Sequence, residues 1–341
     1  MTNDSNTTDS YKSGLSVVLA VHDQAEQIRR NLPIILLQDY GPGYEVIVVD
    51  ESSTDDTEDV LKQLKAQYPH LYTTYIPASS HYVSRRKLAL TIGMKAAHNE
   101  WVIITEASCH PDSDSWLRAM AEAMNSEVDA VCAYTPFDKG TKATYAYSRM
   151  ITWWRQFNSP YRYDGACLAI RKSAFMARNG FLKNLQFLRS EYDFLVNETP
   201  KSRIAVISTP ECRMRQEPPT KKEWTNRQLY HMQSRHALRR AFFHRLFFFF
   251  MQAFVHLGYL FALAFLAFAV YRHDMLFTVG AALILVLLLA LHSFFGHWLA
   301  KRCGEHIAFW KQPFLHLGVA WQFLYYRLRF MSASKYDFIR K

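Results

Sequence analysis

Acidic side chains follow two of the most apolar segments of the chain, at the point where each segment ends. Asp50 and Glu51 close the run EVIVVDE, and Glu106 closes the run WVIITE, with Ser108 two residues later. A carboxylate in such a place can bind a hydroxyl, an N–H of a ring or a divalent cation. Mg²⁺ and Mn²⁺ prefer oxygen ligands, which one or two carboxylates and the phosphates of a substrate usually supply together.

The segments that carry these residues are predicted to be buried strands, because they are β-branched and apolar throughout. The predicted order is strand 15–21, helix 25–38, strand 45–50, helix 57–66, strand 71–76, helix 85–97 and strand 101–105. This alternation predicts an α/β fold with a doubly wound, mostly parallel sheet, which binds ligands beyond the carboxyl ends of its strands. We therefore expect Asp50, Glu51 and Glu106 to line one pocket.

Two further acidic residues near these strand ends could cap helices instead of binding a ligand. Asp55 and Asp114 stand just before predicted helices, where an aspartate often caps the helix N-terminus.

Neither GxxxxGK[ST] nor GxGxxG occurs in the sequence, so the usual phosphate-binding loops are missing. A phosphate group would have to be met by a metal ion and by basic side chains.

Further strands are expected at 128–134 and 203–208, and a glycine-containing turn leads into a short strand within 161–175. The segment 189–198 (RSEYDFLVNE) places carboxylates at the start of an apolar stretch. Residues 214–219 contain two prolines and must be extended or turned.

The C-terminal part has a different composition. Residues 246–271 and 275–300 contain no Asp, Glu, Lys or Arg, and each window is long enough to cross a bilayer as a helix. Basic residues lie before the first window and after the second: Arg235, Arg239, Arg240, Arg245, Lys301 and Arg302. By the positive-inside rule both outer flanks are cytoplasmic, which predicts a hairpin of two spans.

The sequence thus divides into four parts: a disordered N-terminus at 1–14, an α/β domain at 15–220, an amphipathic basic connector at 221–245, and a membrane region at 246–341. In this last region, residues 312–326 are uncharged but short for a span, so an interfacial or re-entrant helix is expected there. A basic tail follows.

The composition argues against several other classes of protein: nucleic-acid-binding, disulfide-stabilised, zinc-cluster and secreted proteins. The net charge is +10, but the basic residues gather beside the predicted spans, where anionic lipid headgroups attract them, so no nucleic acid is expected as a partner. The 5 cysteines form no CxxC pair, which argues against disulfides and a zinc cluster and fits a reducing compartment. The polar start lacks an apolar signal region, so we expect the α/β domain to stay in the cytoplasm.

Three ordered blocks carry a family resemblance: LSVVLAVHDQAEQIRRNL, YEVIVVDESSTDDT and RRKLALTIGMKAAHNEWVIITEASCHPDSDSWL. Together they resemble family-2 glycosyltransferases, over roughly residues 15–235. The resemblance implies a GT-A-like sheet and inverting transfer of a sugar from a nucleotide-diphosphate donor, expected to be UDP-linked. A membrane hairpin after this domain is common among members that act on lipid-linked or growing glycans.

The resemblance also implies roles for donor-binding residues. Asp50 and Glu51 match an acidic pair that contacts uracil or ribose, and Glu26 matches a glutamate near the base. Lys87 matches a lysine common in its block, and Arg86 is placed to meet the diphosphate. For Arg86 a solvated helix face is an equally open alternative.

The Asp-x-Asp metal motif of the family maps onto Glu106-Ala107-Ser108. The resemblance implies that Glu106 and Ser108 hold Mg²⁺ or Mn²⁺. Serine can bind Mg²⁺ but adds no charge, so the affinity for metal should be reduced.

On the acceptor side, the general base of the family maps onto Glu191, with Asp193 as the second candidate, and a base outside this pair stays open. Gly165 begins a segment that resembles the turn that shapes the acceptor site in the family. The QxxRW element keeps Gln228 but has His231 and Met232 in place of Arg and Trp, which puts processive synthesis in doubt.

The resulting hypothesis is a glycosyltransferase of the cell inner membrane that works in polysaccharide biosynthesis at the cell envelope. It would move one sugar to a lipid-linked or polysaccharide acceptor on the cytoplasmic side. The alternative is a catalytically inactive GT-A-like scaffold or binding subunit, since the departures from the family motifs fall at the positions that carry chemistry.

Overall fold

The computed structural model describes residues 13–77, 84–157 and 159–333, so that most of the expected disordered segment 1–14 lies outside the described residues. A mixed sheet forms the centre of the N-terminal domain, with the strands in the order β3-β2-β1-β4-β7-β6-β8. The bounds of the strands are β1 Leu15–Val21, β2 Tyr44–Asp50, β3 Leu71–Tyr75, β4 Trp101–Thr105, β5 Cys109–Pro111, β6 Ala130–Ala133, β7 Cys167–Arg171, β8 Ile204–Ile207 and β9 Met214–Gln216.

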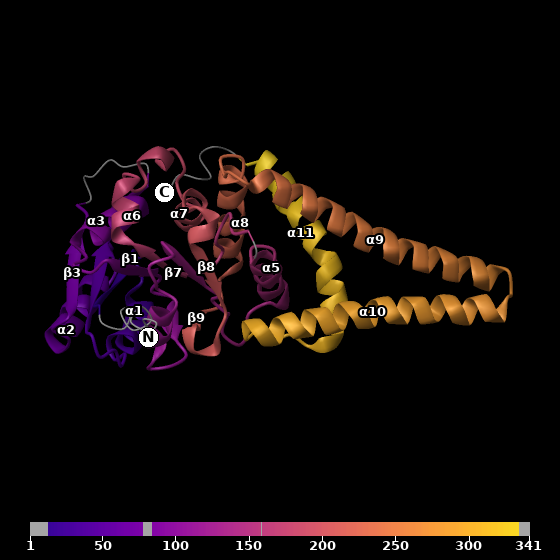
Figure 1. The fold of residues 1–341 in the computed structure, drawn as a ribbon, viewed down its shortest axis with the longest axis horizontal. Helices are drawn as coiled ribbons and strands as arrows, with labels where there is room; N and C mark the ends of the chain where they lie inside the picture. The colour runs from indigo at the N-terminus through magenta and orange to yellow at the C-terminus, as the bar shows by residue number, and fades with distance from the viewer. Residues whose placement is uncertain (1–12, 78–83, 158, 334–341) are drawn as a thin grey trace, which may run out of the picture.

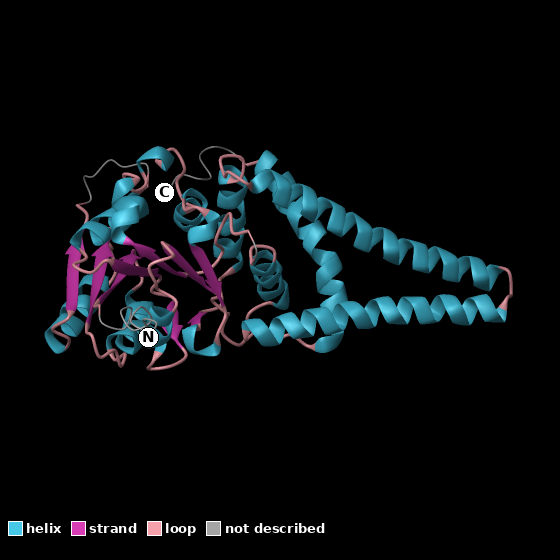
Figure 2. Cartoon of the chain, viewed as in Figure 1, coloured by secondary structure: helices cyan, strands magenta, loops and turns pink. Residues whose placement is uncertain are grey.

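Helices cover the two faces of this sheet and form the C-terminal part of the molecule (Figures 1 and 2). Their bounds are α1 Ala25–Leu36, α2 Thr57–Gln67, α3 Arg85–Ala96, α4 Trp116–Glu122, α5 Ala143–Trp154, α6 Lys172–Ala177, α7 Glu191–Glu198, α8 Lys221–Ser234, α9 Ala241–Tyr271, α10 Met275–Cys303 and α11 Gln312–Met331. Short 3₁₀ turns occupy Leu182–Asn184, Lys201–Arg203, Pro210–Cys212 and Phe309–Lys311.

The sheet is mostly parallel, as the sequence predicted, but one strand reverses. β1 pairs in parallel with β2 and β4, and β2 pairs in parallel with β3. β7 runs antiparallel to both β4 and β6, while β8 is parallel to β6. The carboxyl ends of β1, β2 and β4 therefore meet at one edge of the sheet.

Two hydrophobic cores flank the sheet, because successive side chains of a strand point to opposite faces. On β1, Leu15, Val17 and Leu19 pack with α1, α2 and α4. Val18 and Ala20 pack on the other face with α3, α6 and α7. Both faces are apolar and covered, which is why the strand sequence shows no polar alternation.

A second, two-stranded sheet was not anticipated. The segment Cys109–Pro111, which follows β4 closely, forms β5 and pairs with β9, so that Cys109 lies opposite Gln216. The two prolines after β9 end that strand, since proline cannot donate to a ladder. This pairing places the side chain of Gln216 beside the end of β4.

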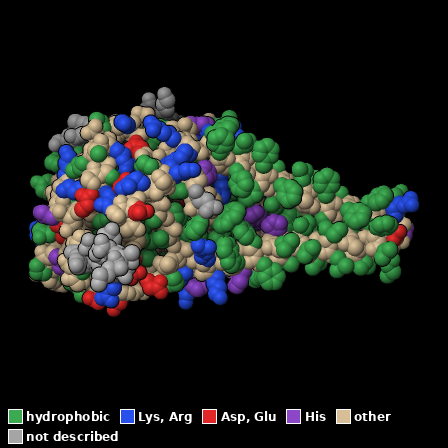
Figure 3. All heavy atoms as spheres, viewed as in Figure 1, with side chains coloured by type: hydrophobic (Ala, Val, Ile, Leu, Met, Phe, Trp, Pro, Cys, Tyr) green, Lys and Arg blue, Asp and Glu red, His purple; other side chains and the backbone are tan. Residues whose placement is uncertain are grey.

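Helices α9 and α10 extend from the domain as a long antiparallel pair joined at residues 272–274, with α11 across the wide end of the pair (Figure 1). Among the described residues, these two helices are the ones long and apolar enough to cross a membrane by length and composition. Large apolar side chains cover their outer surface (Figure 3), and Phe254 and Leu276 are each 81% exposed. Such a continuous exposed apolar surface is typical of a membrane or protein interface.

Helix α11 continues past the predicted 312–326 and packs against α5, α8 and α10. A third core joins α5, α8, α10 and α11, with Trp224 of α8 stacked on Tyr145 of α5 at 4.4 Å between ring centres. The helical pair is thus attached to the sheet domain through packed side chains as well as through the chain.

Candidate active site

Glu106 lies at the carboxyl end of β4, where parts of the chain distant in sequence hold its carboxylate. Arg86 of α3 donates from Nη2 to Oε1 at 3.0 Å, and Gln216 of β9 donates from Nε2 to Oε2 at 3.0 Å. The Nη2 atom of Arg227, on α8, is 3.7 Å from Oε2. Burial raises the pKa of Glu106, but the charges of Arg86 and Arg227 outweigh it and hold the pKa below its usual value.

A second set of contacts orients Gln216. Its Nε2 also donates to Ser108 Oγ at 3.3 Å, and its Oε1 accepts from Arg149 Nη2 at 2.7 Å and from Arg227 Nη1 at 3.4 Å. Arg149, on α5, is 1% exposed, and its guanidinium lies 3.6 Å from the centre of the Phe137 ring. Glu106, Ser108, Gln216, Arg149 and Arg227 therefore form one connected network.

Glu191 and Asp193 lie in the first turn of α7 but in different surroundings. Asp193 accepts from the backbone N–H of Tyr163 at 3.0 Å, lies 3.5 Å from Arg162 Nε, and contacts His231 Nδ1 at 3.3 Å. Burial raises the pKa of Asp193, but Arg162 and His231 outweigh it and lower the pKa. Both oxygens of Asp193 are occupied in holding α7, α8 and the segment before β7 together.

The Glu191 side chain is buried at 4% exposure, and within the described part of the chain its Oε1 has no hydrogen-bond partner. Its negative charge acts on Arg86 and on Lys87. Glu51 and Glu106 act on the same Arg86 guanidinium. The structure thus gathers Glu51, Glu106 and Glu191 around Arg86, from β2, β4 and α7.

Asp50 closes β2 and shapes the loop after it. Its carboxylate accepts from Ser53, through the backbone N–H at 3.0 Å and the hydroxyl at 2.5 Å. Asp55 accepts from the N–H groups of Ala25 and Thr57, so it links α1 to the first turn of α2. Asp114 does not cap α4, whose N-cap is Ser115 without a side-chain hydrogen bond.

Three predicted residues have other surroundings. Glu26 is exposed on α1 and pairs with Arg29. Lys87 is fully buried, and its Nζ donates to the carbonyl oxygens of Asn184, at 2.6 Å, and Phe187, so it fastens the segment that precedes Glu191. Burial lowers the pKa of Lys87 to about 8. Gln228 is half-buried on α8, next to Arg227.

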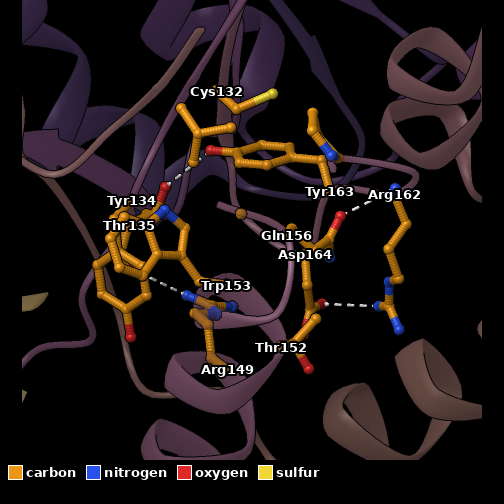
Figure 4. Close-up of a pocket in the computed structure, with 13 residues that line it drawn as sticks. Cys132, Tyr134, Thr135, Arg149, Thr152, Trp153, Gln156, Arg162, Tyr163 and Asp164 are labelled. Atoms are coloured by element: carbon orange, nitrogen blue, oxygen red, sulfur yellow. Dashed lines mark hydrogen bonds and ion pairs between the residues drawn. The ribbon is translucent and has the colours of Figure 1, made fainter. Parts of the chain in front are cut away.

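Gly165 lines a small pocket between β6, α5 and the segment before β7 (Figure 4). Thr135 and Tyr163 point toward one another there, and Arg149 Nη1 donates to the carbonyl oxygen of Thr135 at 2.9 Å. Asp164 also lines this pocket. Asp164 Oδ1 is 4.0 Å from Arg227 Nη1, so this pocket adjoins the network around Glu106.

Several residues of the site were not predicted as such: Arg149, Gln216, Arg162, Tyr163 and Asp164. Arg149 had a signal in the sequence, since it is the one charged residue of the otherwise uncharged segment 143–154. Gln216 had no such signal in the sequence, because its position beside Glu106 depends on the pairing of β9 with β5.

The surroundings of the predicted metal ligands, Glu106 and Ser108, disagree with metal binding. Both oxygens of Glu106 face cationic or N–H donors, and Ser108 accepts from Gln216. No group of three or more His, Cys, Asp or Glu side chains that could hold a metal ion occurs in the described ranges. A divalent cation beside Glu106 would lie against two guanidinium groups, so these residues do not fit a metal ion.

The mixed sheet and the acidic residues at its carboxyl edge define a GT-A domain. Residues 16–180 match the family described as Glycosyl transferase family 2, and this part of the chain is a glycosyltransferase family 2 domain. The sequence has no match among curated proteins.

Solved structures with a similar fold include mannosyltransferase PcManGT from Pyrobaculum calidifontis in complex with GDP-Man and Mn²⁺. It is 18% identical with a TM-score of 0.55, over 94% of this chain and 89% of that chain. Residues 1–349 of S. aureus TarS in complex with UDP are 13% identical with a TM-score of 0.46, over 91% and 92%. At such identities, the similarity to PcManGT shows the fold alone.

Gly165→Ala should destabilise the domain by about 1–3 kcal/mol, because an added methyl group overpacks the site. The new Cβ would lie 2.1 Å from the Tyr163 hydroxyl oxygen. Tyr163 cannot easily move, since that hydroxyl contacts the carbonyl oxygen of Cys167 at 2.7 Å and accepts from its N–H at 3.1 Å. Thermal unfolding checks this, with Gly41→Ala as the control, where no atom lies within 4 Å. Equal midpoints for both variants would contradict the packing argument.

Asp193→Asn should lower stability at pH 7 by roughly 1–3 kcal/mol, because Arg162 loses its charged partner. Since the folded pKa of Asp193 is lowered, its stabilising contribution is present above the ordinary value of 3.8 and is lost as the pH falls through the folded value. The difference between parent and variant should therefore narrow in acid. Unfolding measured from pH 7 to pH 3 tests this, with the exposed Asp114→Asn as control. A constant difference would refute it.

Proposed function

We propose that the protein is a membrane-anchored, inverting glycosyltransferase. It moves one sugar from a nucleotide-diphosphate donor, expected to be UDP-linked, to a lipid-linked or polysaccharide acceptor. The observation that carries the proposal is Glu191, a buried carboxylate with an oxygen that no described group occupies, beside acidic and basic residues at the edge of a GT-A sheet.

The reaction assigns one step to Glu191. Its free oxygen accepts the proton of the acceptor hydroxyl, and the acceptor oxygen forms a bond to C1 of the sugar. The bond between C1 and the phosphate oxygen breaks, and its electron pair stays on the departing nucleoside diphosphate. Asp193 is a positioning residue, because both of its oxygens are engaged with Tyr163, Arg162 and His231.

The donor is proposed to lie along the carboxyl edge of the sheet. Asp50 and Glu51, at the end of β2, would meet the base and ribose. Arg86 would meet the diphosphate, since a guanidinium offers paired N–H donors that match phosphate oxygens. The exposed Glu26 lies in α1, paired with Arg29, and is not needed for this arrangement.

The helical pair is proposed to anchor the domain in a membrane, with the domain on the cytoplasmic side. At about 1.5 Å per residue, α9 and α10 exceed a hydrocarbon core of about 30 Å. Charged residues stand at their far end, where Figure 3 shows basic and acidic side chains and the chain has Arg272 and Asp274. At the near end, Lys221, Lys222 and Arg329 line an open depression. Basic side chains there can meet anionic headgroups.

Glu191→Gln should reduce turnover by about 100-fold or more, because the amide cannot take up the proton. Release of UDP from a UDP-sugar by the protein in native membranes measures it, with the exposed Glu122→Gln as the matched control. Binding of UDP should change little. Equal turnover in parent and variant would contradict the role of Glu191, and absence of turnover with retained UDP binding would favour the scaffold alternative.

Membrane topology can be tested with single cysteines, because all 5 native cysteines are buried. With an impermeant maleimide, Arg272→Cys should be labelled from the outer face of right-side-out vesicles. Lys221→Cys should be labelled only in inside-out vesicles. Labelling of both positions from the same face would contradict the two-span hairpin.

A further inference from the structure

We propose that Arg86 and Arg227 take the place of a divalent cation, so that the protein binds the diphosphate of its donor without metal. This inference rests on the proposed function and names how its site holds the donor. Its basis is that Glu106 and Ser108, the predicted metal ligands, are already hydrogen-bonded to cationic and amide donors.

Each oxygen of Glu106 already accepts a hydrogen bond from a side chain. Its Oε1 accepts from Arg86 at 3.0 Å, and its Oε2 accepts from Gln216 at 3.0 Å with Arg227 at 3.7 Å. A metal ion could bind there only if these donors turned away. The nearby Asp164 offers no substitute, because it lies 3.7 Å from Arg162 and 4.0 Å from Arg227.

The cations nearest Glu106 also oppose a metal ion there. Arg86 Nη2 lies 3.0 Å and Arg227 Nη2 lies 3.7 Å from its carboxylate oxygens, and Arg149 is linked to the same carboxylate through Gln216. A divalent cation beside these guanidinium groups would be in a weakly solvated place, where repulsion between like charges is strong.

Arg227 can exchange its contacts with Gln216 and Glu106 for hydrogen bonds to a bound diphosphate. Its side chain is 27% exposed, compared with 10% for Arg86. Its contacts are long, at 3.4 Å to Gln216 and 3.7 Å to Glu106, so its N–H groups can turn to phosphate oxygens at low cost. Arg149 is a positioning residue: it is 1% exposed and holds Gln216 at 2.7 Å.

The leaving group of the proposed reaction therefore meets guanidinium groups. As the bond from C1 to the phosphate oxygen breaks, that oxygen keeps the electron pair and accepts hydrogen bonds from Arg227 and Arg86. Fixed cationic donors stabilise charge that develops in a transition state. No additional reactant is needed.

The first test measures binding of UDP and GDP to the full-length protein in detergent by calorimetry, with EDTA and then with Mn²⁺. The proposal expects one nucleotide to bind in EDTA, with a dissociation constant that Mn²⁺ changes by less than about twofold. Binding that appears only with Mn²⁺ would overturn the inference while supporting the proposed function. If neither nucleotide binds under either condition, the proposed function falls and the inference with it.

The second test changes Arg227. In EDTA, Arg227→Gln should weaken nucleotide binding about tenfold, the effect of one lost charged hydrogen bond. Arg227→Lys keeps the charge and should recover part of this loss, with unchanged melting temperatures for the unliganded variants. Arg118→Gln, in an exposed ion pair with Asp39, is the matched control and should bind as the parent does. Parent-like binding by Arg227→Gln, or equal loss in the Gln and Lys variants, would overturn the proposal.

Discussion

The ion pair between Arg86 and Glu106 is the interaction on which the site depends. It joins the start of α3 to the end of β4, and a charge at either place would be costly without its partner, since removal from water disfavours an isolated ion. The same carboxylate draws in Gln216 and Arg227, so β9 and α8 must approach the sheet edge for the charges to be satisfied. One carboxylate thereby fixes the positions of segments that are more than 100 residues apart.

A second buried carboxylate joins distant segments in the same way, on the side where we propose that the acceptor binds. Asp193 connects α7 to Arg162 and to His231 of α8. Helix α8 therefore contributes Arg227 to the proposed donor side and His231 to the proposed acceptor side, and it also begins the connection to α9. Through Trp224 it packs into the core shared with α5, α10 and α11. The helices that we propose to lie in a membrane are thus attached to the helix that completes the site.

The sequence was sufficient to predict the strands and helices that have a continuous apolar pattern of their own. Strands β1, β2 and β4 were predicted because both of their faces are buried, and the paired apolar helices because they lack charge. The pairing of β5 with β9 could not be predicted, since three-residue strands carry almost no pattern. The acidic positions 50, 51 and 106 were predicted from strand ends, but the partners of Glu106 on β9 and α8 were not, because Gln216 and Arg227 reach it only through tertiary packing. The family resemblance implied a donor-binding role for Lys87, whereas its ammonium group donates to the backbone in the segment before Glu191.

We propose that Arg86 and Arg227, in place of a metal ion, supply the positive charge of this site, and anomalous scattering tests this most directly. A crystal of the protein grown with UDP and excess Mn²⁺ should show the diphosphate oxygens within hydrogen-bond distance of Arg86 and Arg227, with no anomalous peak beside Glu106. A manganese peak bound to Glu106, with Arg86 turned away from the carboxylate, would contradict it.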